Sequence, residues 1–331
     1  VQAAFCQHPL SWIIIQLGLH AQIQANSGAG ATLRLALERN PEGLLSDLRI
    51  AVPGGAVRHF GEALPALLSG AQLEVGAASV DITPHKAVAL WGQFGLRLSV
   101  TPETPLTANV VALRSGEATT TFVSLDLLQL PEDFVAAVRD AVARKDGSID
   151  VQTIMLSATH THTAPVLVRD TPGIPVSDET MSVAETITYL ADKISDGIVA
   201  AWKQLAPGTM AYGLDRNSIG FSRRVVYADG SARMYGETNQ PGFVHLEGMD
   251  DDDIGSIFFF DEQDGLRAVI VNVACPSQVV EGRSAVNADY WLPVRDRLQA
   301  RYGAGVVVLG WRSAPGDISP PPQLHTAALA R

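Results

Sequence analysis

Two histidines follow directly after an apolar segment that is typical of a buried strand. The segment Val151–Leu156 leads into Ser-Ala-Thr-His-Thr-His, which contains His160 and His162. If the strand continues through them, its two-residue period puts both imidazoles on one face. Two imidazoles at a strand end can bind one metal ion, or combine a metal ligand with a general acid or base. The spacing alone also arises by chance, so the position after a strand is what favours chemistry.

A cysteine and a serine follow two further apolar segments. Cys275 comes after Val271–Ala274, and its thiolate could ligate zinc or act as a nucleophile. A lone cysteine is more often a small buried hydrophobic residue, and by itself the segment favours that interpretation. Ser319 lies in the Gly- and Pro-containing segment 310–320. Backbone N–H groups exposed there would suit oxyanion binding, although most segments of this kind are ordinary turns.

Two charged residues are weaker candidates. Arg223, in Ser-Arg-Arg between predicted strands, could hold a substrate oxygen, but exposed arginines usually have no role so specific. Asp126 ends a predicted strand and could orient a ligand histidine through a hydrogen bond.

Strands and helices alternate from about residue 72 onward, and this order predicts how the candidate residues are positioned. The alternation predicts an α/β fold with a mixed β-sheet flanked by helices, in which sites collect at the carboxyl ends of strands. The predicted strands that lead to the candidate residues end at Ala158, Ala274 and Leu309. The spacing of apolar residues predicts strands over 73–84, 110–114, 120–125, 151–158, 254–260, 266–274 and 306–309, and helices over 133–144, 181–205 and 291–302.

The first 70 residues have a different character. Residues 31–39 have a helical pattern, and Pro41-Glu42-Gly43 and Pro53-Gly54-Gly55 break the segments that follow. No candidate for chemistry occurs among them. We therefore expect an N-terminal extension over residues 1–70 and one catalytic domain over residues 71–331.

Composition excludes several functional classes. The chain has 331 residues, of which 47% are hydrophobic and 18% charged, with a formal net charge of −11. Duplex-binding proteins need clustered Lys and Arg, so nucleic acid is not an expected partner. Two cysteines far apart in sequence indicate no disulfide framework, and no apolar stretch reaches the length of a transmembrane helix.

Four segments in a fixed order resemble the neutral/alkaline non-lysosomal ceramidase family. The resemblance implies that His160 is a zinc ligand and that His162 assists at the scissile amide. It also implies that Arg223 contacts substrate and that Ser319 is a nucleophile or a group lining the site. Zinc would be the cofactor, because it activates water for attack on an amide carbonyl. The matching segments are Val75–Pro84, Val123–Asp126, Ser157–His162 and Gly316–Pro320.

The chain departs from that family in two places. Cys275 occupies the position at which the family has its second zinc histidine, and a subgroup with Cys-Pro-Ser-Gln is similar to this variant. Cysteine can ligate zinc, so the resemblance implies either an altered metal site or a lost one. The family's remaining ligands, a glutamate and a tyrosine, lie well downstream of the serine segment, whereas this chain ends at Arg331. We therefore expect a partial catalytic domain that lacks half of the metal site and the family's C-terminal domain.

The expected function is zinc-dependent hydrolysis of an amide bond in an N-acyl lipid such as ceramide. The alternatives are a hydrolase of another amide or ester, and a catalytically inactive family fragment or binding module. The resemblance suggests a secreted or periplasmic protein, and the sequence leaves the substrate and the oligomeric state open.

Overall fold

The computed structural model describes residues 72–175, 177–248 and 251–320, and the backbone of three short strands before them. The chain divides into two compact units, one of residues 1–74 and 113–120, the other of residues 75–112 and 121–331. In the smaller unit β1 (Arg34–Arg39), β2 (Leu45–Ala51) and β3 (Arg58–His59) form a three-stranded sheet. The predicted helix over residues 31–39 is therefore wrong. Leucines alternate with other residues at 33, 35 and 37, and this two-residue period suits a strand.

An eight-stranded mixed sheet organises the rest of the described chain. Its strand order is β17-β16-β15-β10-β4-β7-β8-β9, with β15 antiparallel to both neighbours and β16–β17 and β8–β9 parallel. The predicted mixed α/β fold is thus confirmed. The strands are β4 (Leu73–Asp81), β7 (Thr107–Ser115), β8 (Ala118–Leu125), β9 (Ile154–Ala158), β10 (Ala206–Arg216), β15 (Asp253–Asp261), β16 (Leu266–Val273) and β17 (Val307–Arg312).

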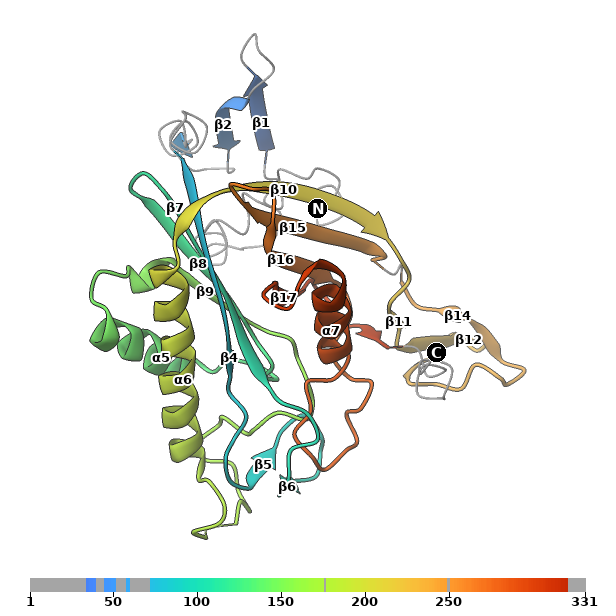
Figure 1. Ribbon diagram of the computed structural model, residues 1–331. Helices are drawn as coiled ribbons and strands as arrows, with labels where there is room; N and C mark the ends of the chain where they lie inside the picture. The colour runs from blue at the N-terminus through green and yellow to red at the C-terminus, as the bar shows by residue number, and fades with distance from the viewer. Residues whose placement is uncertain are drawn as a thin grey trace. The chain divides into compact units, whose positions relative to one another are not determined.

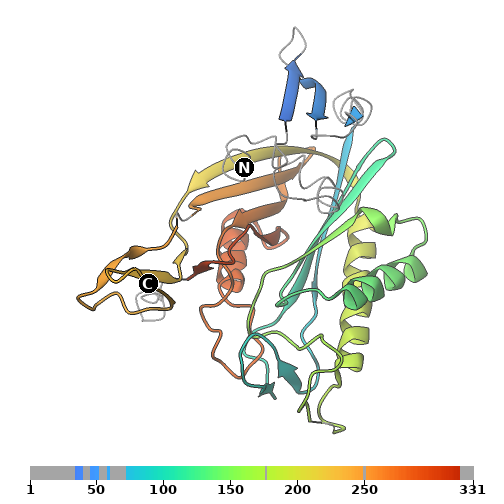
Figure 2. The same ribbon diagram turned by 180° about the vertical axis from the view of Figure 1, so that it is seen from behind.

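Three helices flank this sheet. α5 (Glu132–Lys145) and α6 (Val183–Lys203) lie together on one side of β4, β7, β8 and β9, and α7 (Trp291–Tyr302) lies on the other (Figures 1 and 2). None of the helices in the described part of the chain is both long and apolar enough to span a membrane. Two smaller sheets have two strands each, β5 (Val88–Leu90) with β6 (Arg97–Ser99) and β11 (Phe221–Ser222) with β18 (Ile318–Ser319). A third has three strands, with β12 (Arg224–Tyr227) between β13 (Ala232–Met234) and β14 (Phe243–Leu246).

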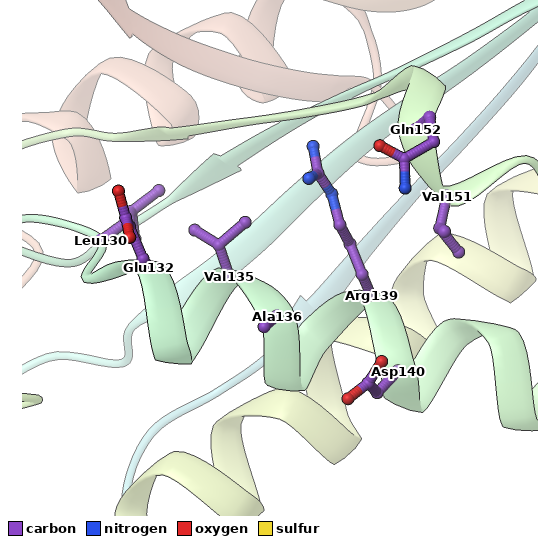
Figure 3. A pocket seen from close by; sticks show the side chains of 8 residues that line it. All are labelled: Leu130, Glu132, Val135, Ala136, Arg139, Asp140, Val151 and Gln152. Atoms are coloured by element: carbon purple, nitrogen blue, oxygen red, sulfur yellow. The ribbon is translucent and has the colours of Figure 1, made fainter.

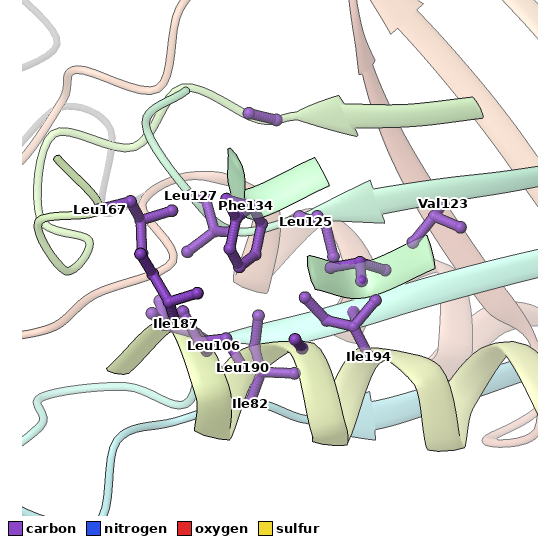
Figure 4. Close-up of a cluster of buried hydrophobic side chains, with 14 of the residues drawn as sticks. Ile82, Leu106, Val123, Leu125, Leu127, Phe134, Leu167, Ile187, Leu190 and Ile194 are labelled. Atoms are coloured by element: carbon purple, nitrogen blue, oxygen red, sulfur yellow. The ribbon is translucent and has the colours of Figure 1, made fainter. Parts of the chain in front are cut away.

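The main core lies between α5, α6 and the sheet. At the start of α6 the side chain of Ser182 accepts a hydrogen bond from the N–H of Glu185, and the side chain of Glu185 accepts one from the N–H of Ser182. This capping box satisfies two backbone N–H groups. From there apolar residues recur at helical spacing, and Ile187, Leu190 and Ile194 are at most 2% exposed. Figure 4 shows these side chains meeting Phe134 of α5 and the buried residues of β8. The core therefore fixes the end of β8, from which the chain runs toward the candidate site.

The sheet curls so that strands near its two ends meet. Ser124 of β8 donates a hydrogen bond from its hydroxyl to the carbonyl of Gly310 in β17, at 2.7 Å. The ring of Phe122 packs edge-on against Trp311, with centroids 5.7 Å apart. The carboxyl ends of β8 and β9 therefore lie close to the carboxyl ends of β16 and β17.

A buried ion pair ties α7 to the end of β8. Both terminal nitrogens of the Arg295 guanidinium donate to the carboxylate of Asp126, at 2.7 and 2.8 Å, and the two residues are 4% and 0% exposed. Asp126 also accepts hydrogen bonds from the backbone and hydroxyl of Thr107 and from the hydroxyl of Thr159. The expectation that Asp126 orients a histidine directly is wrong, because its oxygen atoms are bonded to Arg295 and these two threonines.

We expect Arg295→Met to lower the free energy of unfolding by about 3–5 kcal/mol, because it leaves the buried carboxylate of Asp126 without its counter-charge. Urea denaturation followed by circular dichroism measures this change. Arg297→Met is the matched control, since Arg297 is an exposed residue of the same helix. Equal stability of the two variants would contradict the importance of the pair.

Candidate active site

The first histidine is held where β9 ends. The strand stops at Ala158, so it does not continue through the pair, and His160 has a left-handed backbone with φ 67°. Its N–H donates to the carbonyl of Leu127 at 2.9 Å, and its Nδ1 lies 2.8 Å from the carbonyl oxygen of Leu128. A carbonyl can only accept, so Nδ1 carries the proton and Nε2 keeps a free lone pair.

The left-handed residue brings the two imidazoles together without a continuous strand. The rings of His160 and His162 lie edge to face, with centroids 4.9 Å apart. Nδ1 of His162 is 3.5 Å from both a carboxylate oxygen of Glu281 and the amide nitrogen of Gln278. The Nε2 atom of His162 is buried and has no hydrogen-bond partner within the described residues. This leaves both rings with an Nε2 able to bind a further group.

Burial keeps the imidazoles neutral. It lowers the pKa of His160 to about 4, and the positive charge of Arg312 adds to the effect. Burial also lowers the pKa of His162, against the opposing effect of the Glu281 carboxylate. Neutral imidazole is the form that ligates a metal or accepts a proton.

Arg97 holds the loops around His162 in place. Its guanidinium donates to the carbonyls of His162 at 2.6 Å, Trp91 at 3.0 Å and Glu281 at 2.7 Å, and also to the carbonyl of Arg283. One cation thus joins three separate segments of the chain. No sequence motif surrounds Arg97 or Glu281, so their long-range contacts could not be recognised from spacing.

Cys275 lies beside this arrangement but faces away from solvent. It is 1% exposed and packs with Val273 and Trp291, and its Sγ lies 3.8 Å from the carbonyl oxygen of Ile219. Burial raises the pKa of the thiol to about 12, with the charge of Asp289 adding to the effect. The thiol is therefore protonated at neutral pH, which makes it a poor nucleophile.

The segment after Cys275 runs along the histidine loop. The hydroxyl of Ser277 donates to the carbonyl of Thr159 at 2.7 Å, and the carbonyl of Ser277 accepts from the N–H of His162 at 3.4 Å. Tyr290 donates from its hydroxyl to the carbonyl of Cys275 at 2.8 Å. The Cys-Pro-Ser-Gln segment is therefore positioned against the histidine loop by hydrogen bonds from both backbone and side-chain groups.

Ser319 and Arg223 lie on two segments that are hydrogen-bonded to each other. Ser319 pairs with Phe221 between β18 and β11, and its hydroxyl donates to the carbonyl of Pro320 at 3.3 Å. Arg223 donates from its backbone to Asp317 and from its guanidinium to the carbonyl of Gly316, at 2.8 and 2.6 Å. The charge of Arg223 lowers the pKa of both histidines, though less than burial does.

The structure thus joins some of the candidate residues and not others. The two imidazoles are adjacent, and Arg223 acts on both electrostatically. Over residues 72–175, 177–248 and 251–320, no hydrogen bond links the side chain of Cys275 or Ser319 to either imidazole. Within the same ranges no group of three or more His, Cys, Asp or Glu residues is placed to hold a metal.

A separate groove of about 410 Å³ runs along α5 (Figure 3). Arg139 lies in it and donates to the carbonyl of Ile154 at 3.2 Å, so it covers the start of β9. None of the predicted site residues lines the groove. Its lining consists of Leu130, Glu132, Val135, Ala136, Arg139, Asp140, Val151 and Gln152.

We expect Gly92→Ala to displace His162 and to destabilise the chain by about 2 kcal/mol or more. Gly92 has φ 104°, and a Cβ atom there would lie 2.6 Å from Cγ of His162. Thermal unfolding and the NMR shifts of the imidazole protons measure both effects. Gly95→Ala is the control in the same loop, because its Cβ would meet no atom within 4 Å. A Gly92→Ala variant with unchanged His162 resonances would refute the close packing.

Cys275 should resist thiol reagents in the folded chain. With a pKa of about 12, only about one thiol in 10⁴ is ionised at pH 8, and burial blocks access as well. In a Cys6→Ser background, which leaves one cysteine, Ellman's reagent should react slowly until urea unfolds the protein. Rapid reaction under native conditions would show that the thiol is exposed or activated.

Comparison with known proteins places this arrangement in a known fold. No protein-family model matches the sequence. No curated protein matches it either. A neutral ceramidase from Pseudomonas aeruginosa matches the structure with a TM-score of 0.59 and 18% identity, over 75% of this chain and 39% of that one. A ceramidase complexed with C2 matches with a TM-score of 0.60, the same identity and the same coverage.

The chain spans 39% of the length of these two proteins. At 18% identity the likeness concerns the fold, and it covers three quarters of this chain. The resemblance that the four sequence segments predicted is therefore confirmed in three dimensions: this chain has a ceramidase-like fold.

Proposed function

We propose that this chain contributes to the active site of a zinc-dependent hydrolase that cleaves an amide bond in an N-acyl lipid such as ceramide. The observation that carries the proposal is the pair of neutral imidazoles at the carboxyl end of β9, in a fold shared with ceramidase structures. One of the two tautomers is set by a backbone carbonyl.

His160 fits as one ligand of a zinc site, and His162 fits as an acid or base beside it. The Nδ1–H of His160 is bonded to a carbonyl, which is the usual second bond of a metal-ligating histidine. The Nε2 atom of His162 is buried and has no partner among the described residues, so a proton, a water molecule or a substrate group is needed to satisfy it. Zinc takes three or four protein ligands, so further donors must join His160 for a complete site.

Cys275 fits less well as the second ligand. Its thiol must lose a proton to bind zinc, whereas burial among Val273 and Trp291 favours the protonated form. A bound cation would reverse this preference, because metals deprotonate coordinating thiols. We keep Cys275 as a proposed ligand for that reason.

The proposed mechanism divides the work among the residues of this chain. Zinc, when bound, supplies a nucleophile at neutral pH and polarises a carbonyl group. His160 would hold the metal through Nε2. His162 would accept a proton from the attacking water at Nε2 and pass it to the leaving amine, with Glu281 beside its Nδ1 to stabilise the ring while it is charged. Arg223 would contact the substrate near the reacting carbonyl, and Ser319 would line the site.

The catalytic test uses the full chain with added zinc and a fluorescent short-chain ceramide. We expect His162→Gln to lower kcat by about 10²–10⁴, the usual contribution of a general acid or base. We expect His160→Asn to lose bound zinc, measured by mass spectrometry of the metal. His85→Gln is the control, since His85 is exposed and its ring packs at a tilt against that of Tyr189.

Two results separate this proposal from its alternatives. Faster cleavage of an ester with the same acyl chain would favour a hydrolase of a different substrate. Absence of stoichiometric zinc together with unchanged ceramide would favour a binding module without catalysis. Full activity of His162→Gln would remove that histidine from the mechanism.

A further inference from the structure

Arg312 lies at the edge of the histidine site and has no part in the mechanism above. It is the last residue of β17 and stands opposite Val273 in the parallel register with β16. The N–H of Ser313 donates to the carbonyl of Val273 at 3.0 Å, which keeps the two strand ends together. Arg312 therefore leaves the sheet at the same end as Cys275.

No acidic side chain among the described residues forms an ion pair with the guanidinium of Arg312. The residue is half-buried, and within residues 72–175, 177–248 and 251–320 it makes no hydrogen bond or ion pair through its side chain. Burial lowers its pKa, opposed only by the phenol of Tyr290. A half-buried guanidinium that is partly shielded from water and has no partner among the described residues is available to bind an anion.

Three other arginines that are buried or half-buried make side-chain hydrogen bonds, although Nε of Arg97 has no partner within the described residues. Arg295 makes a two-fold bond with Asp126, and Arg97 donates to four backbone carbonyls. Arg223 donates to the carbonyl of Gly316. Arg312 is the exception among these four described arginines.

The carboxylates nearby are already engaged. Glu281 lies beside Nδ1 of His162 and accepts from Gln278 at 2.9 Å. Asp289 accepts from the backbone N–H groups of Val280 and Tyr290, at 2.9 and 2.8 Å. The charges that lower the pKa of His160 come from Arg312, His162 and Arg223, although the formal net charge of the chain is −11.

We propose that Arg312 binds a carboxylate of the substrate next to the scissile amide, so that N-acyl amino acids are preferred over neutral N-acyl amines. The planar guanidinium matches a carboxylate in a two-bond geometry. One unpaired guanidinium balances one negative charge, which suits a carboxylate better than a phosphate dianion. Hydrolysis consumes one water, breaks the C–N bond, and releases a carboxylic acid and an amino acid whose nitrogen takes the proton.

This inference rests on the proposed amide hydrolase function, and a matched pair of substrates tests it. N-lauroylglycine and N-lauroylethanolamine share the acyl chain and the amide but differ in the carboxylate. The full chain with zinc should show a higher kcat/KM for N-lauroylglycine. Arg312→Gln should lower that value about tenfold or more, the size of a charge-assisted bond, and leave N-lauroylethanolamine within about threefold.

Two control variants accompany Arg312→Gln. Arg301→Gln removes the same charge from an exposed position at the end of α7 and should change neither substrate. Arg312→Lys keeps the charge without the planar geometry and should recover part of the preference. The melting temperature of Arg312→Gln should match that of the parent, because the half-buried guanidinium makes no hydrogen bond or ion pair within the described residues.

Direct binding separates the two proposals. Calorimetry with N-lauroylglycine, without added metal, should give a Kd about tenfold weaker in Arg312→Gln and unchanged in Arg301→Gln. Cleavage of neither substrate would overturn the hydrolase proposal, and the binding result would then decide the role of Arg312 alone. A preference for N-lauroylethanolamine, or an equal loss for both substrates in Arg312→Gln, would overturn the inference.

Discussion

The carboxylate of Asp126, fully buried at the end of β8, is the point at which the fold and the candidate site are joined. It receives two bonds from Arg295 of α7, two from Thr107 of β7 and one from Thr159. Thr159 immediately precedes His160, so the same oxygen atoms that dock the helix also limit where the histidine loop can lie. A buried pair of this kind costs desolvation energy, and the several bonds to one carboxylate offset that cost.

The candidate site is built chiefly from main-chain contacts. Carbonyls of Leu127 and Leu128 fix His160, and Arg97 joins the carbonyls around His162. Contacts of this type depend on the path of the backbone more than on side-chain identity. At 18% identity the likeness to the two ceramidase structures concerns the fold alone.

Much of the fold followed from periodicity. The helix over 291–302 and the strands around the site lie where apolar spacing predicts them, because each buries one face against the sheet. The strand after Val151 begins late, since Val151–Thr153 form a short 3₁₀ turn capped by Asp150. The helical pattern over residues 31–39 misled because a short leucine-rich run satisfies both periods in part.

The candidate site was less predictable than the fold. The spacing of His160 and His162 predicted that they form a pair, but it did not predict the left-handed backbone of His160 that brings the two rings together. The partner of Asp126 lies 169 positions away in sequence, and Arg97 contacts residues up to 186 positions away. Contacts so remote leave no local pattern, so only the folded chain shows them.

The left-handed backbone at position 160 restricts which amino acids can replace His160 during evolution. At φ 67°, side chains branched at Cβ collide with their own backbone, while glycine, asparagine and aspartate are tolerated. A lineage that abandons the imidazole can thus retain the loop only through a few small or polar replacements. Drift toward valine or isoleucine would reshape the turn itself, and the neighbouring ring of His162 would lose its place with it.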